Sequence, residues 1–193
     1  MLVMHPSYVP ERRVSGVLFA DYVRMMRGQK DVDWSAQLEP QDVQYLLGKI
    51  EPKAWYPMDT FERMGNAILA RVAGGSVEAV RAWGRFSVDQ LRTAQPGLVA
   101  DGDPVDTLMR FRVLRSTYFD FEAIEVTTLA DGEAAIVIHY YMGAQAEEAA
   151  SYQTMGFFER LLEISGAHEV ESRFRERSWA GDPRTVLSLE WVL

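Results

Sequence analysis

The amino-acid sequence predicts an α+β protein in which an N-terminal helical part is followed by a hairpin, a helix and a second hairpin. Before residue 120 the apolar residues recur at helical spacing, whereas after it they alternate in two pairs of runs. A turn signal divides each pair, at Asp131-Gly132 and at Gly181-Asp182-Pro183. Strands that are apolar on one face are typical of a sheet covered on one side. We therefore expect a four-stranded antiparallel sheet packed on helices.

The predicted helices have clear start and stop residues. Pro40 suits a first helical turn and Ser76 is a favourable N-cap, while Gly28, Gly48 and the Gly74-Gly75 pair end helices. We expect helices at residues 17–27, at 38–49, within 54–75, from 76 to the break at 95–97, at 105–116 and at 151–167.

Length and composition indicate an ordinary globular protein. With 193 residues, 48% of them hydrophobic, the chain can bury a sizeable core, and we expect one domain over residues 14–193 after an N-terminal arm over residues 1–13. The chain has no cysteine, which excludes disulfides and thiolate chemistry. A net charge of -8 argues against nucleic acid as a partner. Since neither a signal peptide nor a long apolar window is recognisable, we expect no membrane span and a cytoplasmic location.

Motifs of known catalytic or metal sites are missing from the sequence. It contains no GxSxG nucleophile motif, no glycine-rich phosphate loop and no histidine pair at metal-binding spacing. His139 is expected on a strand without a convergent second group, which favours a structural histidine. We therefore expect a protein that is not an enzyme.

The charged face of the last hairpin has two interpretations. Arg173, Arg175 and Arg177 are expected on the face opposite Val170 and Phe174, and they can form salt bridges with Glu190 on the returning strand. Alternatively they form a docking surface, because arginine is enriched at interfaces. A homodimer through this strand or a sheet edge is one such arrangement.

Several segments resemble haem nitric-oxide/oxygen-binding (H-NOX) domains, in the same order along the chain. "YPMDTFERMGNAIL" resembles the tyrosine-proline start of an H-NOX helix, and "DTLMRFRVLRSTYFDF", "IHYY" and "MGFFERLLEISG" follow it. The closing "RERSWAGDPRTVLSLEW" is similar to the tail of four-vinyl-reductase-type ligand-binding domains. Residues 14–193 as a whole look most like an uncharacterised paralogous family expanded in myxobacteria, a distant branch of the same superfamily. The resemblance implies an H-NOX-like fold.

The resemblance also implies that the cofactor sites are lost. The proximal haem ligand of H-NOX domains is a histidine in a stretch similar to "DTLMRFR", where Met109 stands here. The Tyr-x-Ser-x-Arg motif for the haem propionates falls on Tyr140, Met142 and Ala144, so only the tyrosine is kept. The zinc-binding cysteines of the four-vinyl-reductase-type domains correspond to Arg177 and Thr185. We expect no cofactor and no metal, and we expect Met109 to pack into the space that a haem would occupy.

Two functions remain open on this basis. The leading hypothesis is a non-enzymatic, haem-free sensory or scaffolding domain in bacterial signalling, which acts through contact with an unidentified partner protein. The alternative is a receptor for a small apolar or aromatic ligand, with a pocket between helices and sheet. Its expected lining residues, which ordinary core packing would equally explain, are Trp55, Tyr56, Trp83, Met109, Phe111 and Tyr118.

Overall fold

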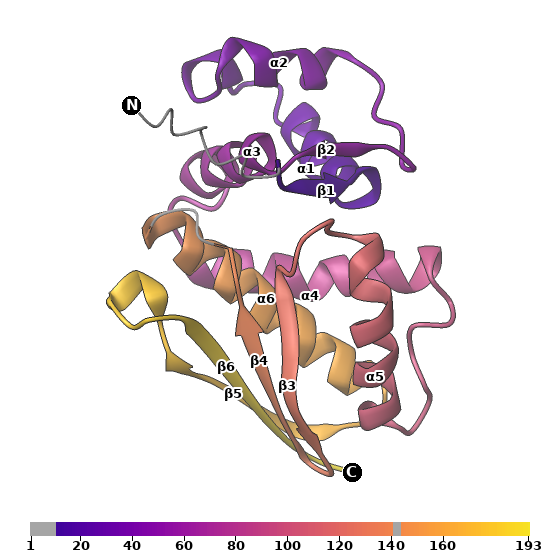
Figure 1. Ribbon diagram of the computed structural model, residues 1–193. Helices are drawn as coiled ribbons and strands as arrows, with labels where there is room; N and C mark the ends of the chain where they lie inside the picture. Colours follow the sequence, from indigo (N-terminus) through magenta and orange to yellow (C-terminus); the bar gives the residue numbers. More distant parts are fainter. Residues whose placement is uncertain (1–10, 141–143) are drawn as a thin grey trace, which may run out of the picture.

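The computed structural model describes residues 11–140 and 144–193, and its elements confirm the predicted α+β class. They form an upper group of helices above a lower group of helices and a sheet (Figure 1). Each helix expected from the sequence is present, and all but the last have ends close to the expected positions; the last helix begins at Ala144 rather than at residue 151.

The upper group holds three helices, a short 3₁₀ turn and a small sheet that the sequence did not reveal. Its bounds are β1 Arg13–Ser15, α1 Gly16–Gly28, η1 Trp34–Ala36, α2 Pro40–Leu47, β2 Trp55–Pro57 and α3 Met58–Arg71. Strands β1 and β2 pair antiparallel, with Val14 opposite Tyr56. Three-residue strands are too short to show alternation, which explains why the sequence pattern missed them.

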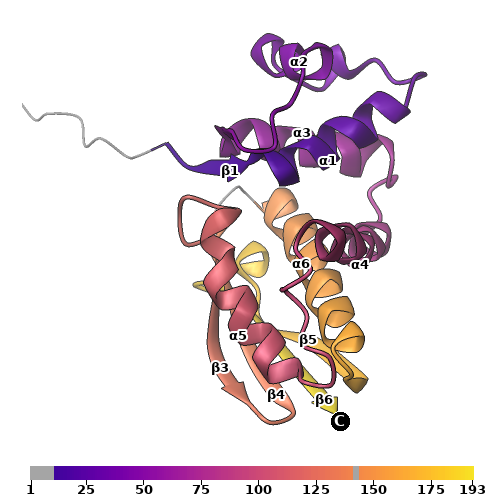
Figure 2. The ribbon, with the colours of Figure 1, turned by 90° about the vertical axis from the view of Figure 1, so that its right-hand side faces the viewer.

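The lower group holds the remaining helices and the predicted sheet. Its bounds are α4 Val77–Ala94, α5 Pro104–Leu114, η2 Arg115–Thr117, β3 Ile124–Ala130, β4 Glu133–Ile138, α6 Ala144–Ile164, β5 His168–Glu176, η3 Ser178–Ala180 and β6 Thr185–Val192. The strand order is β3-β4-β6-β5, and neighbouring strands are antiparallel. Figure 2 shows the sheet, α6 and α4 as successive layers.

Helix starts follow the local chemistry of the chain. The Ser76 side chain accepts a hydrogen bond from the backbone N–H of Ala79 at 3.3 Å, and Asp103 accepts one from Asp106 at 2.8 Å. Pro40 occupies the first turn of α2, where its missing N–H costs nothing. These caps satisfy donors that would otherwise have no partner at a helix end.

Glycines bring α4 and α6 into backbone contact. A Cβ atom at Gly84 would overlap the carbonyl of Gln153, and one at Gly156 would overlap the carbonyl of Arg81. The two glycines therefore set the closeness of this helix pair, which forms one wall of the cavity described below.

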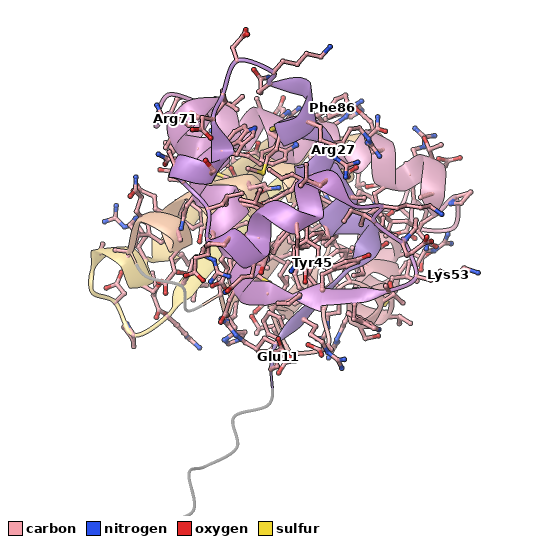
Figure 3. The ribbon with its side chains drawn as sticks, turned by 90° about the horizontal axis from the view of Figure 1, so that it is seen from above. Glu11, Arg27, Tyr45, Lys53, Arg71 and Phe86 are labelled. Atoms are coloured by element: carbon pink, nitrogen blue, oxygen red, sulfur yellow. The ribbon has the colours of Figure 1, made fainter. Side chains whose placement is uncertain are left out.

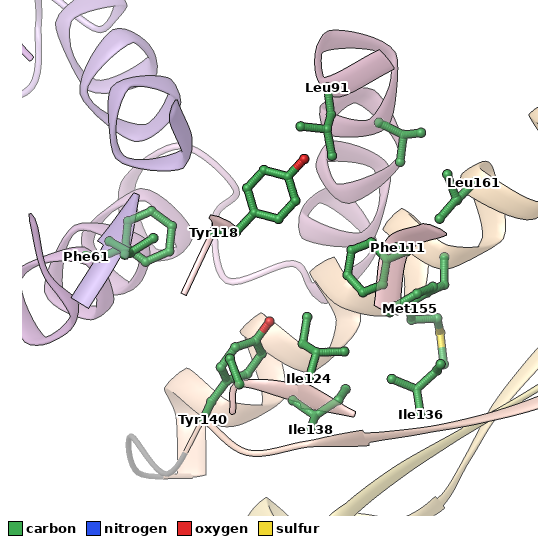
Figure 4. Packing of buried hydrophobic residues seen from close by; sticks show 14 of the residues in the cluster. Phe61, Leu91, Phe111, Tyr118, Ile124, Ile136, Ile138, Tyr140, Met155 and Leu161 are labelled. Carbon is green, nitrogen blue, oxygen red and sulfur yellow. The ribbon is translucent and has the colours of Figure 1, made fainter. Parts of the chain in front are cut away.

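The core extends through both groups. Buried side chains of the upper helices, such as Phe19 and Met64, belong to the same apolar cluster as Phe158 of α6 and Leu187 of β6. Part of this cluster is seen from close by in Figure 4. In the ranges 11–140 and 144–193, no helix is long and apolar enough to cross a membrane.

Candidate ligand-binding cavity

A cavity of about 460 Å³ lies between the upper and the lower group. Side chains from five helices line it, together with residues in and next to the sheet, and it is partly open to solvent. Most of them are apolar or aromatic, and they include Leu18, Met58, Phe61, Leu69, Val80, Trp83, Leu91, Phe111, Tyr118, Phe119, Ile124 and Phe157.

The structure brings three of the six predicted pocket residues together. Trp83, Phe111 and Tyr118 line the cavity, although they come from α4, from α5 and from the segment after η2. Trp55 and Tyr56, both in β2, do not line it. The Tyr56 ring stacks on Phe19 at 4.5 Å between ring centroids, so Tyr56 is a packing residue of the upper group.

The prediction that Met109 fills the interior is wrong. Met109 is 47% exposed, whereas its neighbour Leu108 is fully buried and Phe111 lines the cavity. The inner face of α5 carries Pro104, Thr107, Leu108 and Phe111, and Met109 lies outside this set. The hydrophobic character of Met109 misled the prediction, because α5 has only a weak difference in polarity between its faces.

Sequence patterns missed the polar residues of the cavity. Glu62, Asn66, Gln153 and Thr154 contribute to the lining, from α3 and α6. They lie on helices whose apolar periodicity predicted only the core-facing positions. The one available signal was their place beside such positions, for example Glu62 directly after Phe61.

Two lining tyrosines already have hydrogen-bond partners. The Tyr22 hydroxyl donates to Oε1 of Gln153 at 2.8 Å, and the Tyr140 hydroxyl lies 2.9 Å from Oγ1 of Thr154. Burial raises the pKa of Tyr22 well above its usual range and that of Tyr140 to about 12, while the hydrogen bond with Thr154 opposes the rise at Tyr140. Both phenols are therefore protonated at neutral pH.

Tyr118 differs from these two tyrosines. Its side chain is buried, with 4% of the residue exposed, and its hydroxyl makes no hydrogen bond within the described part of the chain. Burial raises its pKa to about 12, and a weak polar interaction with the Thr117 side chain partly offsets this rise. The Thr117 hydroxyl donates its own hydrogen bond to the Leu114 carbonyl at 2.6 Å, and its contact with Tyr118 falls short of hydrogen-bond geometry. The backbone of Tyr118 is fixed, because its carbonyl accepts a hydrogen bond from the N–H of Ser15 at 2.8 Å.

A partly buried carboxyl lies at the cavity beside a cation. Oε1 of Glu62 accepts a hydrogen bond from Nη2 of Arg12 at 3.0 Å, and Arg12 also donates to the Tyr140 carbonyl at 2.6 Å. Burial raises the pKa of Glu62 to about 7, because the opposing effect of Arg12 is smaller and Asp59 adds a repulsive charge. Glu62 is therefore the lining group that changes charge near neutral pH.

The other predicted residues lie away from the cavity. Nη2 of Arg173 pairs with Oε1 of Glu190 at 2.8 Å and Arg175 approaches the same oxygen at 3.9 Å, on the charged face of the sheet. Arg177 is exposed, and its backbone N–H donates to Oδ2 of Asp182 at 2.6 Å. Ala144 is exposed at the start of α6, and Met142 lies outside the described residues.

Comparison with known proteins shows the class of fold and then particular structures. No protein-family model and no curated protein matches the chain. The fold is that of H-NOX proteins.

The Fe(II) unliganded H-NOX protein from K. algicida aligns with a TM-score of 0.65 and 12% identity, over 93% of this chain and 97% of the other. An H-NOX mutant from S. oneidensis in the Fe(II) state aligns with a TM-score of 0.64, 11% identity and coverage of 93% and 96%. A single-residue mutant of T. tengcongensis H-NOX gives 0.60, 13% identity and coverage of 93% and 98%.

The residues around the cavity do not fit a haem. The lining contains no histidine, and Met58 is its only methionine within the described residues. Methionine is a usual haem ligand opposite a histidine, and tyrosine ligates as a phenolate, which Tyr22 and Tyr140 do not readily form. The lining arginine, Arg24, pairs with Asp21 at 2.9 Å, which leaves it poorly placed to hold propionates.

Proposed function

We propose that this protein is a receptor for a small, predominantly apolar molecule, which binds in the cavity between the upper and the lower group. The observation that carries the proposal is the cavity itself, about 460 Å³ in volume with mostly apolar walls. Ligand sites in proteins are typically clefts of roughly 300–1,000 Å³ with apolar walls and few polar groups. Of the two functions that the sequence left open, the geometry favours the receptor.

The proposal includes two negative statements. The receptor works without haem. In support, the described lining has no suitable axial ligand, and its arginine, Arg24, is already paired. It also catalyses no reaction: the lining tyrosines have raised pKa values, and the carboxyl of Glu62 is held by Arg12 rather than by a second catalytic group. We further propose that it is cytoplasmic and signals to a protein partner.

Native mass spectrometry of the protein purified from the organism that makes it tests the receptor directly. We expect a bound species of a few hundred daltons at one per chain, which organic solvent extracts. A Soret band with stoichiometric iron in the same preparation would instead contradict the haem-free part of the proposal.

A variant that fills the cavity locates the binding site. Ala150 lines the cavity from α6, and the change Ala150→Phe introduces a ring into it. We expect this variant to lose the bound species. Ala82→Phe is the matched control, because Ala82 is exposed on α4 and does not line the cavity. Equal occupancy of the two folded variants would place the ligand elsewhere.

A second candidate function, signalling by protein contact alone, has one specific observation in its favour. Met109 and Val113 are 47% and 75% exposed and lie one turn apart on α5, so they form a small apolar surface. Substitution of Val113 by Glu would abolish signalling in cells in this case, while Ala150→Phe would leave it intact. The receptor hypothesis expects Ala150→Phe to abolish the response.

A further inference from the structure

The hydroxyl of Tyr118 is a buried polar group with an unmet hydrogen bond at the cavity. In Figure 4 the Tyr118 ring lies between Phe61 and Leu91, and its oxygen is turned away from Ile124 toward Leu91. All three of these neighbours line the cavity and are apolar. Among the described residues the Tyr118 hydroxyl makes no hydrogen bond.

A protein interior seldom retains such a group without a reason. Leaving a buried hydroxyl unpaired is costly, because it loses its hydrogen bonds to water on folding. The other two lining tyrosines each have a side-chain partner on α6, Gln153 or Thr154. Tyr118 is thus distinguished from residues of the same type in the same cavity.

We propose that the ligand carries an oxygen that accepts a hydrogen bond from the Tyr118 hydroxyl, while its carbon skeleton fills the apolar remainder of the cavity. This inference rests on the proposed receptor function. The phenol is a donor at neutral pH, since its raised pKa keeps it protonated. The chemical class is a neutral ketone or alcohol, because the lining is mostly apolar and its arginine, Arg24, already pairs with Asp21.

The backbone supports a fixed donor rather than an adaptable one. Tyr118 follows the 3₁₀ turn η2, and its N–H donates to the Arg115 carbonyl at 3.0 Å. Its carbonyl is held by Ser15 of β1, as described above. These two backbone hydrogen bonds hold the main chain of Tyr118, and the burial of its ring limits movement of the side chain.

The test compares two probes of nearly equal shape, tetralin and 1-tetralone, which differ by one carbonyl oxygen. Their dissociation constants are measured by isothermal titration calorimetry with the unmodified protein and with Tyr118→Phe. We expect the preference for 1-tetralone over tetralin to fall by about three- to tenfold in the variant, the effect of one neutral hydrogen bond. The difference in hydration between the two probes cancels in this comparison.

Tyr140→Phe is the matched control, because Tyr140 also lines the cavity but its hydroxyl already has Thr154 as a partner. We expect its preference to equal that of the unmodified protein. If both probes bind and Tyr118→Phe keeps the same preference, the inference is overturned while the receptor function stands. If neither probe binds to the unmodified protein, the receptor function itself is contradicted.

The stability of the ligand-free variants gives an independent readout. Tyr118→Phe removes an unpaired buried hydroxyl, so we expect unfolding at the same or a higher temperature. Tyr140→Phe removes the hydrogen bond between Tyr140 and Thr154, so we expect this variant to unfold at a lower temperature. A clear fall in the unfolding temperature of Tyr118→Phe would show that its hydroxyl is already paired within the protein, and would overturn the inference.

Discussion

At the scale of single residues, Glu62 couples the cavity to pH. Its pKa is raised from 4.5 to about 7 in the folded protein, so the folded state binds a proton that the unfolded state releases between these values. Stability is then lost as pH rises through this window, in contrast to the usual carboxylate. We expect Glu62→Gln to match the unmodified protein at pH 4, below the unfolded pKa, and to be more stable at pH 8, on the order of 2 kcal/mol.

Urea unfolding at the two pH values measures this difference. Glutamine keeps an oxygen that can accept from Arg12, so the substitution mainly removes the titrating proton. Parallel pH profiles of the two proteins would show that Glu62 is not the group responsible.

Asp42 is a second residue whose ionisation matters, with the opposite sign. Burial would raise its pKa, but hydrogen bonds from Arg63 and Thr60 together outweigh burial and lower the pKa below its usual value. Nε and Nη2 of Arg63 lie 2.7 and 2.8 Å from the two carboxylate oxygens, and Asp42 is fully buried. The stability that this group contributes is therefore present at neutral pH and is lost as pH falls through the lowered pKa.

Removing one partner of this pair has a large expected effect. Arg63→Gln leaves a buried carboxylate without its cation, and we expect a loss of about 3 kcal/mol in the free energy of unfolding at pH 7. Lys49→Gln is the control, since Lys49 pairs with Glu51 on the exposed surface and the loss should be much smaller. Similar losses in the two variants would refute the assignment.

At the scale of elements, the crossing of α4 and α6 depends on Gly84 and Gly156. Alanine normally stabilises a helix relative to glycine, but here its Cβ would overlap the backbone of the opposite helix. We expect Gly84→Ala to lower the free energy of unfolding by about 1–3 kcal/mol, as over-packing does. Gly28→Ala, where a Cβ meets no atom within 4 Å, should be neutral or slightly stabilising. Urea denaturation of both variants measures the two free energies of unfolding, and equal values would contradict the proposed role of Gly84.

The elements also show how far the sequence could be interpreted. Helix periodicity predicted α1 to α6, and the turn signals placed both hairpins, because these features are local. The β1–β2 pair joins segments far apart in the chain, and no local pattern encodes it. The sequence predicted α5 as a helix but not which of its faces is buried, because Met109 and Val113 are apolar and yet exposed. The polar residues of the cavity were missed because they are brought together by tertiary packing, which no local sequence pattern encodes.

At the scale of the whole molecule, α5 connects the cavity with the surface. Phe111 contributes to the cavity wall, and Met109 and Val113 lie on the exposed side of the same helix. Phe86, which is 58% exposed, borders a groove of about 290 Å³ between α1 and α4, near the Arg27 end of α1 (Figure 3). A bound ligand can therefore change the surface through the helices that contact it.

The absence of cysteine allows this idea to be measured. A single label can be attached after Met109→Cys, because the natural chain contains no other thiol. We expect an environment-sensitive dye at this position to change its emission when tetralin binds. Leu47→Cys, on α2 and 85% exposed, should give no change. Equal responses at the two positions, or none at position 109, would argue against transmission through α5.

The short strand β1 has a consequence for how the protein is made. Ser15 and Arg13 form backbone hydrogen bonds with Tyr118 and Asp120, and Nε of Arg13 pairs with Oδ2 of Asp120 at 2.6 Å. During synthesis the first strand therefore emerges long before the segment that completes its bonds. The upper helices and the β1–β2 pair can form early, but the boundary of the cavity closes only after α6 has been made. A nascent chain stalled before Asp120 should therefore be cleaved by proteases near β1 more readily than the complete chain.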